Sequence, residues 1–157
     1  MLYDYWGAFC EEYMRSSAFQ PYVNDQNTFG FFSDNALDFS SQNNAILQRF
    51  LDIKDRSDAA YLTARAFMDE KGAAKVTDAL NNEFAGMLAE KYYKGVREAL
   101  DKIDPQLLYL GSRLHGTPKY LEGVVRAAGK YCDIVSINYY SRWSPEGKTY
   151  MPKWAEW

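Results

Sequence analysis

The chain has 157 residues, which is enough for one hydrophobic core and too few for two ordinary domains. Hydrophobic residues make up 47% and charged residues 25%, with a net charge of −3, so the composition excludes a disordered chain and a surface that binds nucleic acid by neutralising phosphates. The aromatic share is 17%, and rings with an apolar face and a polar tip suit amphipathic ligands such as sugars.

The sequence gives no sign of a cofactor or a membrane segment. Cys10 and Cys132 lie far apart and form neither a metal-binding spacing nor a disulfide framework, and a single histidine argues against a histidine-based metal site. No run approaches the roughly 20 apolar residues of a membrane helix. The opening MLYDYWGAFCEEY lacks the basic-then-apolar order of a signal peptide. We therefore expect no metal, cofactor, nucleic acid or membrane partner, and export stays open if the true N-terminus lies elsewhere.

The first third of the chain predicts a helix followed by a short strand. Apolar residues recur at helical spacing over 6–18, and Pro21 disfavours helix just before it. The run TFGFF, 28–32, is rich in β-forming residues and typical of a strand that is buried on both faces.

The middle of the chain, 43–103, has a helical pattern. AILQRFL predicts a short amphipathic helix; Ser57 is the expected cap of a second helix, which Gly72 ends. A long third helix is predicted from Thr77 to 103, with apolar residues every three or four positions, and the Asp-Pro pair at 104–105 stops it.

The last third predicts a strand, a helix and a strand. LLYLGSR, 107–113, is a continuous apolar run; Thr117 and Pro118 suit the cap and first turn of a helix; and DIVSINYY, 133–140, follows as a strand. This order is a βαβ unit with parallel strands, so the fold class is α/β. Each predicted strand ends in polar residues, and no glycine-rich nucleotide loop follows any of them, which favours a barrel.

Three stretches together resemble consecutive strand ends of a clan A glycoside hydrolase, most similar to the β-agarases: GFFSDNAL, LLYLGSRLHG and VVRAAGKYCDIVSINYYSRW. The resemblance runs from about residue 24 to residue 143. It implies that 1–157 is a fragment of a single catalytic barrel, a partial (β/α)8 TIM barrel with approximately strands 4 to 6 and their helices. The same or another chain would supply the rest of the barrel, and the parent enzyme would be secreted or periplasmic.

The resemblance also implies that a catalytic carboxylate is missing. In clan A the fourth barrel strand ends in Asn-Glu, and this glutamate is the general acid/base; here the pair reads Asn35 and Ala36. Asn35 matches the asparagine that hydrogen-bonds the sugar 2-hydroxyl. Retaining hydrolysis needs two carboxyl groups roughly 5 to 5.5 Å apart, and the clan carries the second at the end of strand seven, before which we expect this chain to stop. Without the resemblance, Ala36 would be interpreted as the start of a helix behind good capping residues.

Polar and aromatic residues after the other two predicted strands are candidate saccharide contacts. Arg113 either faces the pocket or pairs with a structural acid, and His115 either touches a sugar hydroxyl or has no role. The remaining candidates are Asn138, Tyr139, Tyr140 and Trp143, the last as a stacking platform for a sugar ring. Because side chains alternate along a strand, Tyr139 and Tyr140 cannot both point inward, and we favour Tyr139.

The predicted function is that of a retaining, cofactor-free glycoside hydrolase acting on a galactose-containing polysaccharide, inactive in this chain because Ala36 replaces the acid/base residue. Two alternatives remain open. The chain is a saccharide-binding pseudoenzyme, or it is an α/β scaffold that docks a protein partner through the helix at 77–103. The last alternative requires the apolar face of Phe84, Leu88 and Val96 to be exposed.

Overall fold

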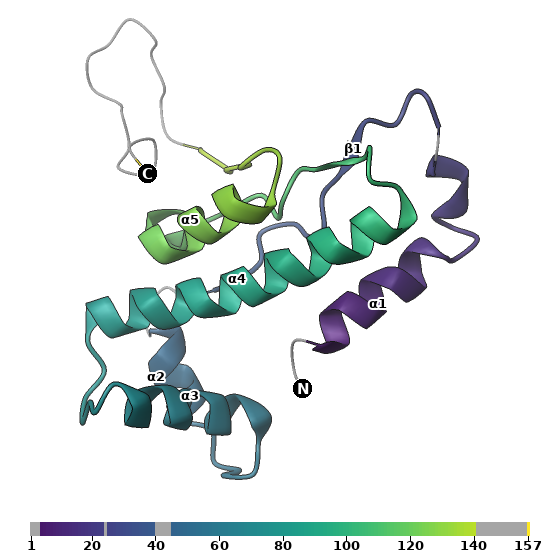
Figure 1. The fold of residues 1–157 in the computed structure, drawn as a ribbon. Coiled ribbons are helices and arrows are strands. Elements are labelled where there is room, and N and C mark those ends of the chain that lie inside the picture. The colour runs from purple at the N-terminus through teal and green to yellow at the C-terminus, as the bar shows by residue number, and fades with distance from the viewer. Residues whose placement is uncertain (1–3, 24, 40–44, 141–156) are drawn as a thin grey trace, which may run out of the picture.

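The long helix α4, Asp78–Ile103, is the element against which most of the chain packs (Figure 1). The computed structural model describes residues 4–23, 25–39, 45–140 and 157. These residues form a mixed α/β arrangement that is mostly helical, with a small sheet. None of the described helices is both long enough and apolar enough to cross a membrane.

Helix α4 confirms the predicted third helix at both ends. Thr77 is the N-cap, and its side chain accepts a hydrogen bond from the Leu80 backbone N–H at 3.2 Å. The helix ends at Ile103, directly before Asp104 and Pro105. Phe84, Leu88 and Val96 are only 0%, 5% and 1% exposed, because this face packs within the chain. The alternative that this helix docks a protein partner requires an exposed apolar face, so the burial of these residues argues against it.

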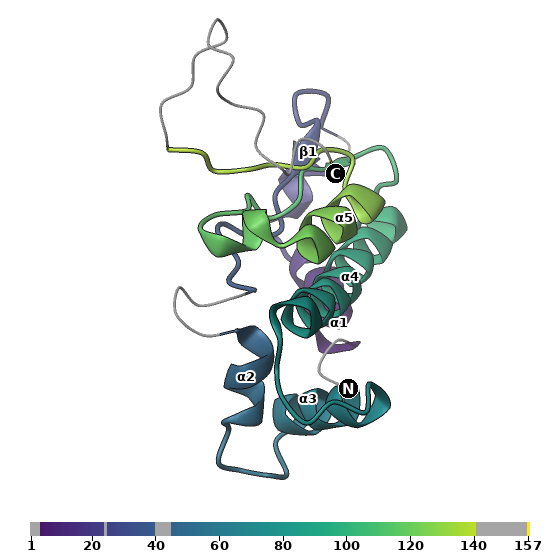
Figure 2. The same cartoon turned by 90° about the vertical axis from the view of Figure 1, so that its left-hand side faces the viewer.

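The other helices surround α4. They are α1 (Asp4–Met14), α2 (Ile46–Leu51), α3 (Ala59–Glu70), α5 (Glu122–Tyr131) and the 3₁₀ turns η1 (Gln20–Tyr22) and η2 (Thr117–Tyr120). Helices α1 and α5 pack along α4, and both views show α2 and α3 on the opposite side of α4 from the sheet (Figures 1 and 2). The α4–α5 crossing is close, since a Cβ added at Gly86 would lie 2.9 Å from the Cα of Gly123.

The sheet is parallel, as predicted. Strand β1 (Gly30–Phe31) pairs with β2 (Leu108–Tyr109), with Gly30 opposite Leu108. Backbone hydrogen bonds extend the pairing beyond the assigned strands: the Ser33 N–H donates to the Gly111 carbonyl at 2.9 Å. Gly30 is required by this pairing, because a Cβ there would lie 2.5 Å from the Leu108 carbonyl oxygen.

The predicted third strand, 133–140, is shorter than expected. It is not an assigned strand but joins the sheet through one isolated parallel bridge, between Leu114 and Ile137. Two further bonds hold it beside the β2 segment: Asp133 N–H to the Tyr109 carbonyl at 2.9 Å and Asn138 N–H to the Leu114 carbonyl at 2.8 Å. Three extended segments therefore lie side by side in the order 29–33, 108–114 and 133–138.

The expectation that these strands are buried on both faces holds only in part: on the second face Leu110 is buried, but its neighbours are exposed. Phe31 and Tyr109 occupy one face of the sheet, where Tyr109 is fully buried under the helices. Side chains alternate along a strand, so Phe32 and Leu108 lie on the other face, and they are 43% and 37% exposed. Among the described residues, helices cover only one face of the sheet.

Three predicted helix ends are also corrected. The first helix ends at Met14, short of residue 18. The N-cap of α3 is Asp58, which accepts from the Ala60 N–H at 2.7 Å, while Ser57 donates to Asp55 instead. Thr117 and Pro118 begin the 3₁₀ turn η2, and α5 starts only after Leu121, whose apolar side chain forms no cap.

Candidate saccharide site

The carboxyl ends of the three extended segments lie at the same edge of the sheet. Because the segments are parallel and hydrogen-bonded in order, residues 33–36, 111–115 and 137–140 all follow the paired residues on that side. In open and closed parallel sheets this edge is where polar functional residues gather. Most of the predicted site residues come from these three stretches.

Ala36 has an unusual backbone. Its φ is 63°, in the left-handed region that residues other than glycine avoid, and it lies in a bend. The alternative interpretation as a helix start is therefore wrong. Beside it, the Asp34 carboxylate accepts a hydrogen bond from the Asn35 N–H at 2.6 Å, and Asn35 itself is exposed. Strained residues of this kind cluster at functional sites, which fits the predicted importance of position 36.

Arg113 connects the end of the second segment to the first. Its φ is 25°, which makes it the other non-glycine residue with positive φ among the described residues. The guanidinium lies over the ring of Phe32, 4.8 Å from its centroid, which is a cation–π contact. The exposed Arg113 side chain therefore reaches across to the segment that carries Asn35 and Ala36.

His115 lies beside the third segment. Its ring makes an edge contact with Tyr140, with centroids 5.5 Å apart, and Tyr140 is 79% exposed. Tyr139 is half-buried, which agrees with the expectation that the two tyrosines point in different directions. The Asn138 backbone is bonded to Leu114, and Trp143 lies outside the described residues.

Buried hydroxyl groups below this edge were missed by the sequence prediction. The Tyr92 hydroxyl donates to Ser33 Oγ at 3.0 Å, and Ser33 Oγ is 2.7 Å from the Tyr109 hydroxyl. A second pair joins the Tyr93 hydroxyl to Ser112 Oγ at 2.7 Å. The signal in the sequence was a serine ending each apolar run and two adjacent tyrosines within the apolar stripe of α4.

These bonds tie α4 to the two strained positions. Ser33 precedes Ala36 by three residues, and Ser112 directly precedes Arg113. Burial raises the pKa of all three tyrosines well above the usual value, so their phenols stay protonated and act as neutral hydrogen-bonding groups. The left-handed backbone at the site edge is therefore supported by packed, fully bonded side chains.

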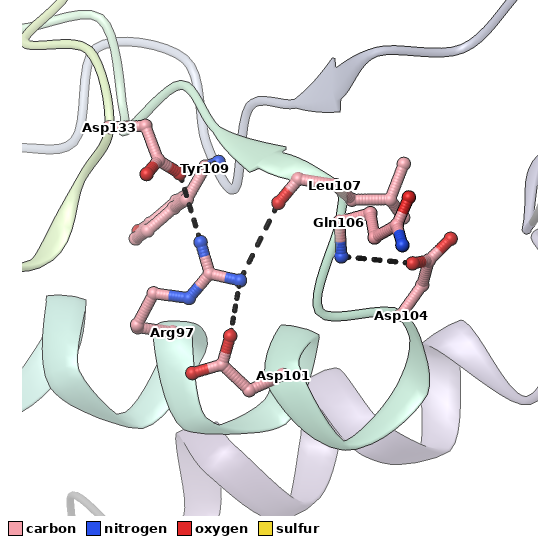
Figure 3. A network of polar contacts seen from close by, with 7 residues as sticks. All are labelled: Arg97, Asp101, Asp104, Gln106, Leu107, Tyr109 and Asp133. Carbon is pink, nitrogen blue, oxygen red and sulfur yellow. Dashed lines mark hydrogen bonds and ion pairs between the residues drawn. The ribbon is translucent and has the colours of Figure 1, made fainter.

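The opposite edge of the sheet carries an ionic network (Figure 3). Arg97 on α4 donates to Asp133 at 3.0 Å and pairs with Asp101 at 2.6 Å, and its second nitrogen is 3.5 Å from the Leu107 carbonyl. Asp133 also accepts from the Tyr109 N–H at 2.7 Å. Because Tyr109 and Asp133 lie at the start of the second and third segments, the network fixes the relative position of these two segments, and it lies away from the candidate site.

The chemical groups at the candidate site are ones that suit binding. The site offers an amide, a guanidinium, an imidazole and phenol rings, which recognise hydroxyl groups and sugar faces. The alanine methyl group at position 36 cannot transfer a proton. The described residues contain no group of three or more histidine, cysteine or acidic side chains placed to hold a metal ion.

Comparison with solved structures finds similarity to parts of larger proteins. The crystal structure of BpGH50 matches with 52% identity and a TM-score of 0.86, over 96% of this chain and 34% of that protein. The structure of an agarase, AgWH50C, matches with 27% identity and a TM-score of 0.54, over 71% of this chain and 18% of that protein. The structure of an exo-β-agarase matches with 24% identity and a TM-score of 0.65, over 85% of this chain and 23% of that protein, and shows a likeness of fold.

The chain thus spans about a third of the length of BpGH50, from the 34% coverage, and less of the two agarases. No protein-family model matches it, and a search of curated proteins finds no match.

Proposed function

We propose, from the premise that this chain is a relative of the family 50 β-agarases, that it forms part of the saccharide site of an agarase-like glycoside hydrolase. The relationship confirms the resemblance predicted from the sequence. The substrate class in this proposal is a galactose-containing polysaccharide. The chain supplies approximately strands 4 to 6 of a (β/α)8 barrel, whose remainder comes from the same or another polypeptide.

The open face of the sheet supports this architecture. Phe32 and Leu108 are large apolar side chains, and within the described residues no helix covers them. A parallel sheet is normally covered on both faces or closed into a barrel. Closure by further strands would bury these side chains in a barrel interior and turn the edge that carries Asn35, His115 and Tyr139 into a common pocket.

The observation that carries the functional proposal is the left-handed alanine at the end of the first segment. Ala36 stands where the family pattern has the acid/base glutamate. Its φ of 63° is a strained backbone conformation, and such conformations cluster at functional sites. Without that carboxyl group the retaining mechanism has no proton donor. We therefore propose that the chain binds saccharide and turns over little or none.

Restoring the carboxyl group tests this proposal. Ala36→Glu, made in the polypeptide with the rest of the barrel, is expected to raise release of reducing sugar from agarose by about a hundredfold to ten-thousandfold, the usual effect of general acid help. Ala36→Gln is the matched control, because glutamine has nearly the same shape as glutamate and no acidic proton. Equal activity of the two variants would contradict the proposed role of position 36.

The runner-up is a saccharide-binding pseudoenzyme in which Ala36 is native. The exposed edge residues favour it as the second candidate, because Tyr140, 79% exposed and in contact with His115, offers a ring to a sugar without needing a carboxylate. Agaro-oligosaccharide titration distinguishes the two candidates when combined with the activity assay. Binding without any gain of activity in Ala36→Glu would favour the pseudoenzyme.

A further inference from the structure

Lys119 is a lysine buried at the edge of the sheet that carries the candidate site. It lies in the turn η2, between the end of the second segment and α5, and it is only 8% exposed. Lysine is almost never buried this deeply unless its ammonium is paired with an acid. No carboxylate among the described residues pairs with Lys119, in contrast to Lys94, which pairs with Glu98.

The contacts of Lys119 are made with the third segment and with its own turn. Its ammonium donates to the Asn138 carbonyl at 3.2 Å. The same nitrogen lies 5.8 Å from the ring centroid of Tyr139 and 5.3 Å from that of Tyr120. Both are within the range of a cation–π interaction. Lys119 thus holds two adjacent predicted saccharide-binding residues, one by its backbone and one by its ring.

The third segment needs such a support, because the sheet holds it weakly. It is not an assigned strand, and its pairing with the second segment consists of one isolated bridge, at Ile137, and a few backbone hydrogen bonds, the last of them from the Asn138 N–H to the Leu114 carbonyl. Beyond the Asn138 N–H, the direction of the described chain depends on contacts outside the sheet. A lysine that is buried with no acid partner among the described residues does not stabilise the fold by ion pairing, so its value lies in the positions that it fixes.

We propose that Lys119 is a positioning residue, which sets the direction of the Asn138 and Tyr139 side chains toward a bound saccharide. This proposal rests on the proposed function for its ligand and goes beyond it in assigning the residue. A hydrogen bond from a charged group to a backbone carbonyl is among the stronger ones in proteins, and it is stronger still when water is excluded. Loss of the ammonium therefore frees the end of the third segment.

The variant Lys119→Met tests the proposal, because methionine keeps most of the length and removes the charge. In the full chain we expect agaro-oligosaccharide affinity to fall about tenfold, from the loss of a charge-assisted bond. We expect the thermal unfolding temperature to stay unchanged or rise, because replacing a buried charge by an apolar side chain is often neutral or stabilising. Lys94→Met, an exposed lysine on α4, is the matched control and should change neither quantity.

The outcomes separate the alternatives. Unchanged saccharide affinity in Lys119→Met overturns the proposal. A fall in affinity with a matching fall in unfolding temperature also overturns it, because that result indicates a purely structural role. If the unsubstituted chain binds no saccharide, the proposed function fails, and the positioning role is decided by the Tyr139 ring resonances in NMR spectra. They should shift in Lys119→Met and not in Lys94→Met, and an unshifted ring overturns the proposal.

Discussion

At the scale of single residues, the hydroxyl pairs beneath the site edge are hydrogen bonds whose contribution to stability can be measured. Tyr93 and Ser112 are both almost fully buried, and each satisfies the other with one bond of 2.7 Å. Removing one partner leaves the other hydroxyl group buried, with neither water nor a protein group to bond to. Their contribution is therefore best measured by removing one partner and then both.

Tyr93→Phe is expected to destabilise the chain by about 1–3 kcal/mol, because the Ser112 hydroxyl is left buried without its tyrosine partner. The double variant Tyr93→Phe with Ser112→Ala should recover part of that loss. Denaturant unfolding of the four proteins gives a double-mutant cycle. Strict additivity of the two changes would show that the 2.7 Å pair is not coupled.

The same scale shows what the sequence could and could not predict about the site. The polar residues that end each segment were predicted from their positions after apolar runs, and the structure places Arg113 against Phe32 and His115 against Tyr140. Lys119 was missed, because a lysine beside a proline in a polar stretch looks exposed. Only the three-dimensional meeting of η2 with the third segment buries it.

At the scale of elements, helix α4 was predicted almost to the residue and the sheet was not. The Thr77 cap and the Asp104-Pro105 stop are local signals that act within one turn, so they are readable in the sequence. The third segment depends on pairing with another segment of the chain, and among the described residues this pairing is one bridge, Leu114–Ile137, with a few backbone hydrogen bonds. Apolar content predicted an extended run there, and it could not predict how many residues would pair.

The close contact between helices α4 and α5 leads to a prediction at the scale of elements. A Cβ at Gly123 would lie 2.6 Å from the Asn82 carbonyl, so Gly123→Ala must push the two helices apart. We expect a loss of about 1–3 kcal/mol, the usual cost of overpacking a close contact. Gly129→Ala in the same helix is the matched control, because its nearest neighbour would be 3.9 Å away. There we expect a gain of up to about 1 kcal/mol, measured by thermal or denaturant unfolding. Equal effects of the two substitutions would contradict the close packing.

At the scale of the whole molecule, the aromatic residues, which make up 17% of the sequence, are divided between the core and the surface. Part of it forms the buried tyrosine cluster between α4 and the sheet, and part of it, such as Phe32 and Tyr140, remains exposed at the sheet and its edge. Composition predicted the excess of rings and a sugar-binding use for it. It could not separate rings that pack a core from rings that stay exposed, because both have the same local pattern.

The buried tyrosines also make the stability of the whole fold depend on alkaline pH. Burial holds the pKa of Tyr92, Tyr93 and Tyr109 above the ordinary value of 10.0, and it raises the pKa of the Cys132 thiol from 9.0 to about 12. Above these ordinary values the unfolded chain loses protons that the folded chain keeps, so the free energy of unfolding falls as pH rises. Stability from these groups is fully present below about pH 9, the ordinary thiol value, and decreases above it.

Tyr109→Phe should make that decrease shallower by about 1.4 kcal/mol per pH unit above pH 10, because one group no longer contributes to the proton difference. Urea unfolding between about pH 8 and 12 measures the slope, and the offset caused by losing the bond to Ser33 does not affect it. Tyr120→Phe is the matched control, because Tyr120 is 54% exposed and the comparison isolates the effect of burying a tyrosine. An equal slope for Tyr109→Phe and the parent chain would mean that water reaches the tyrosine cluster and that the helices do not seal this face of the sheet.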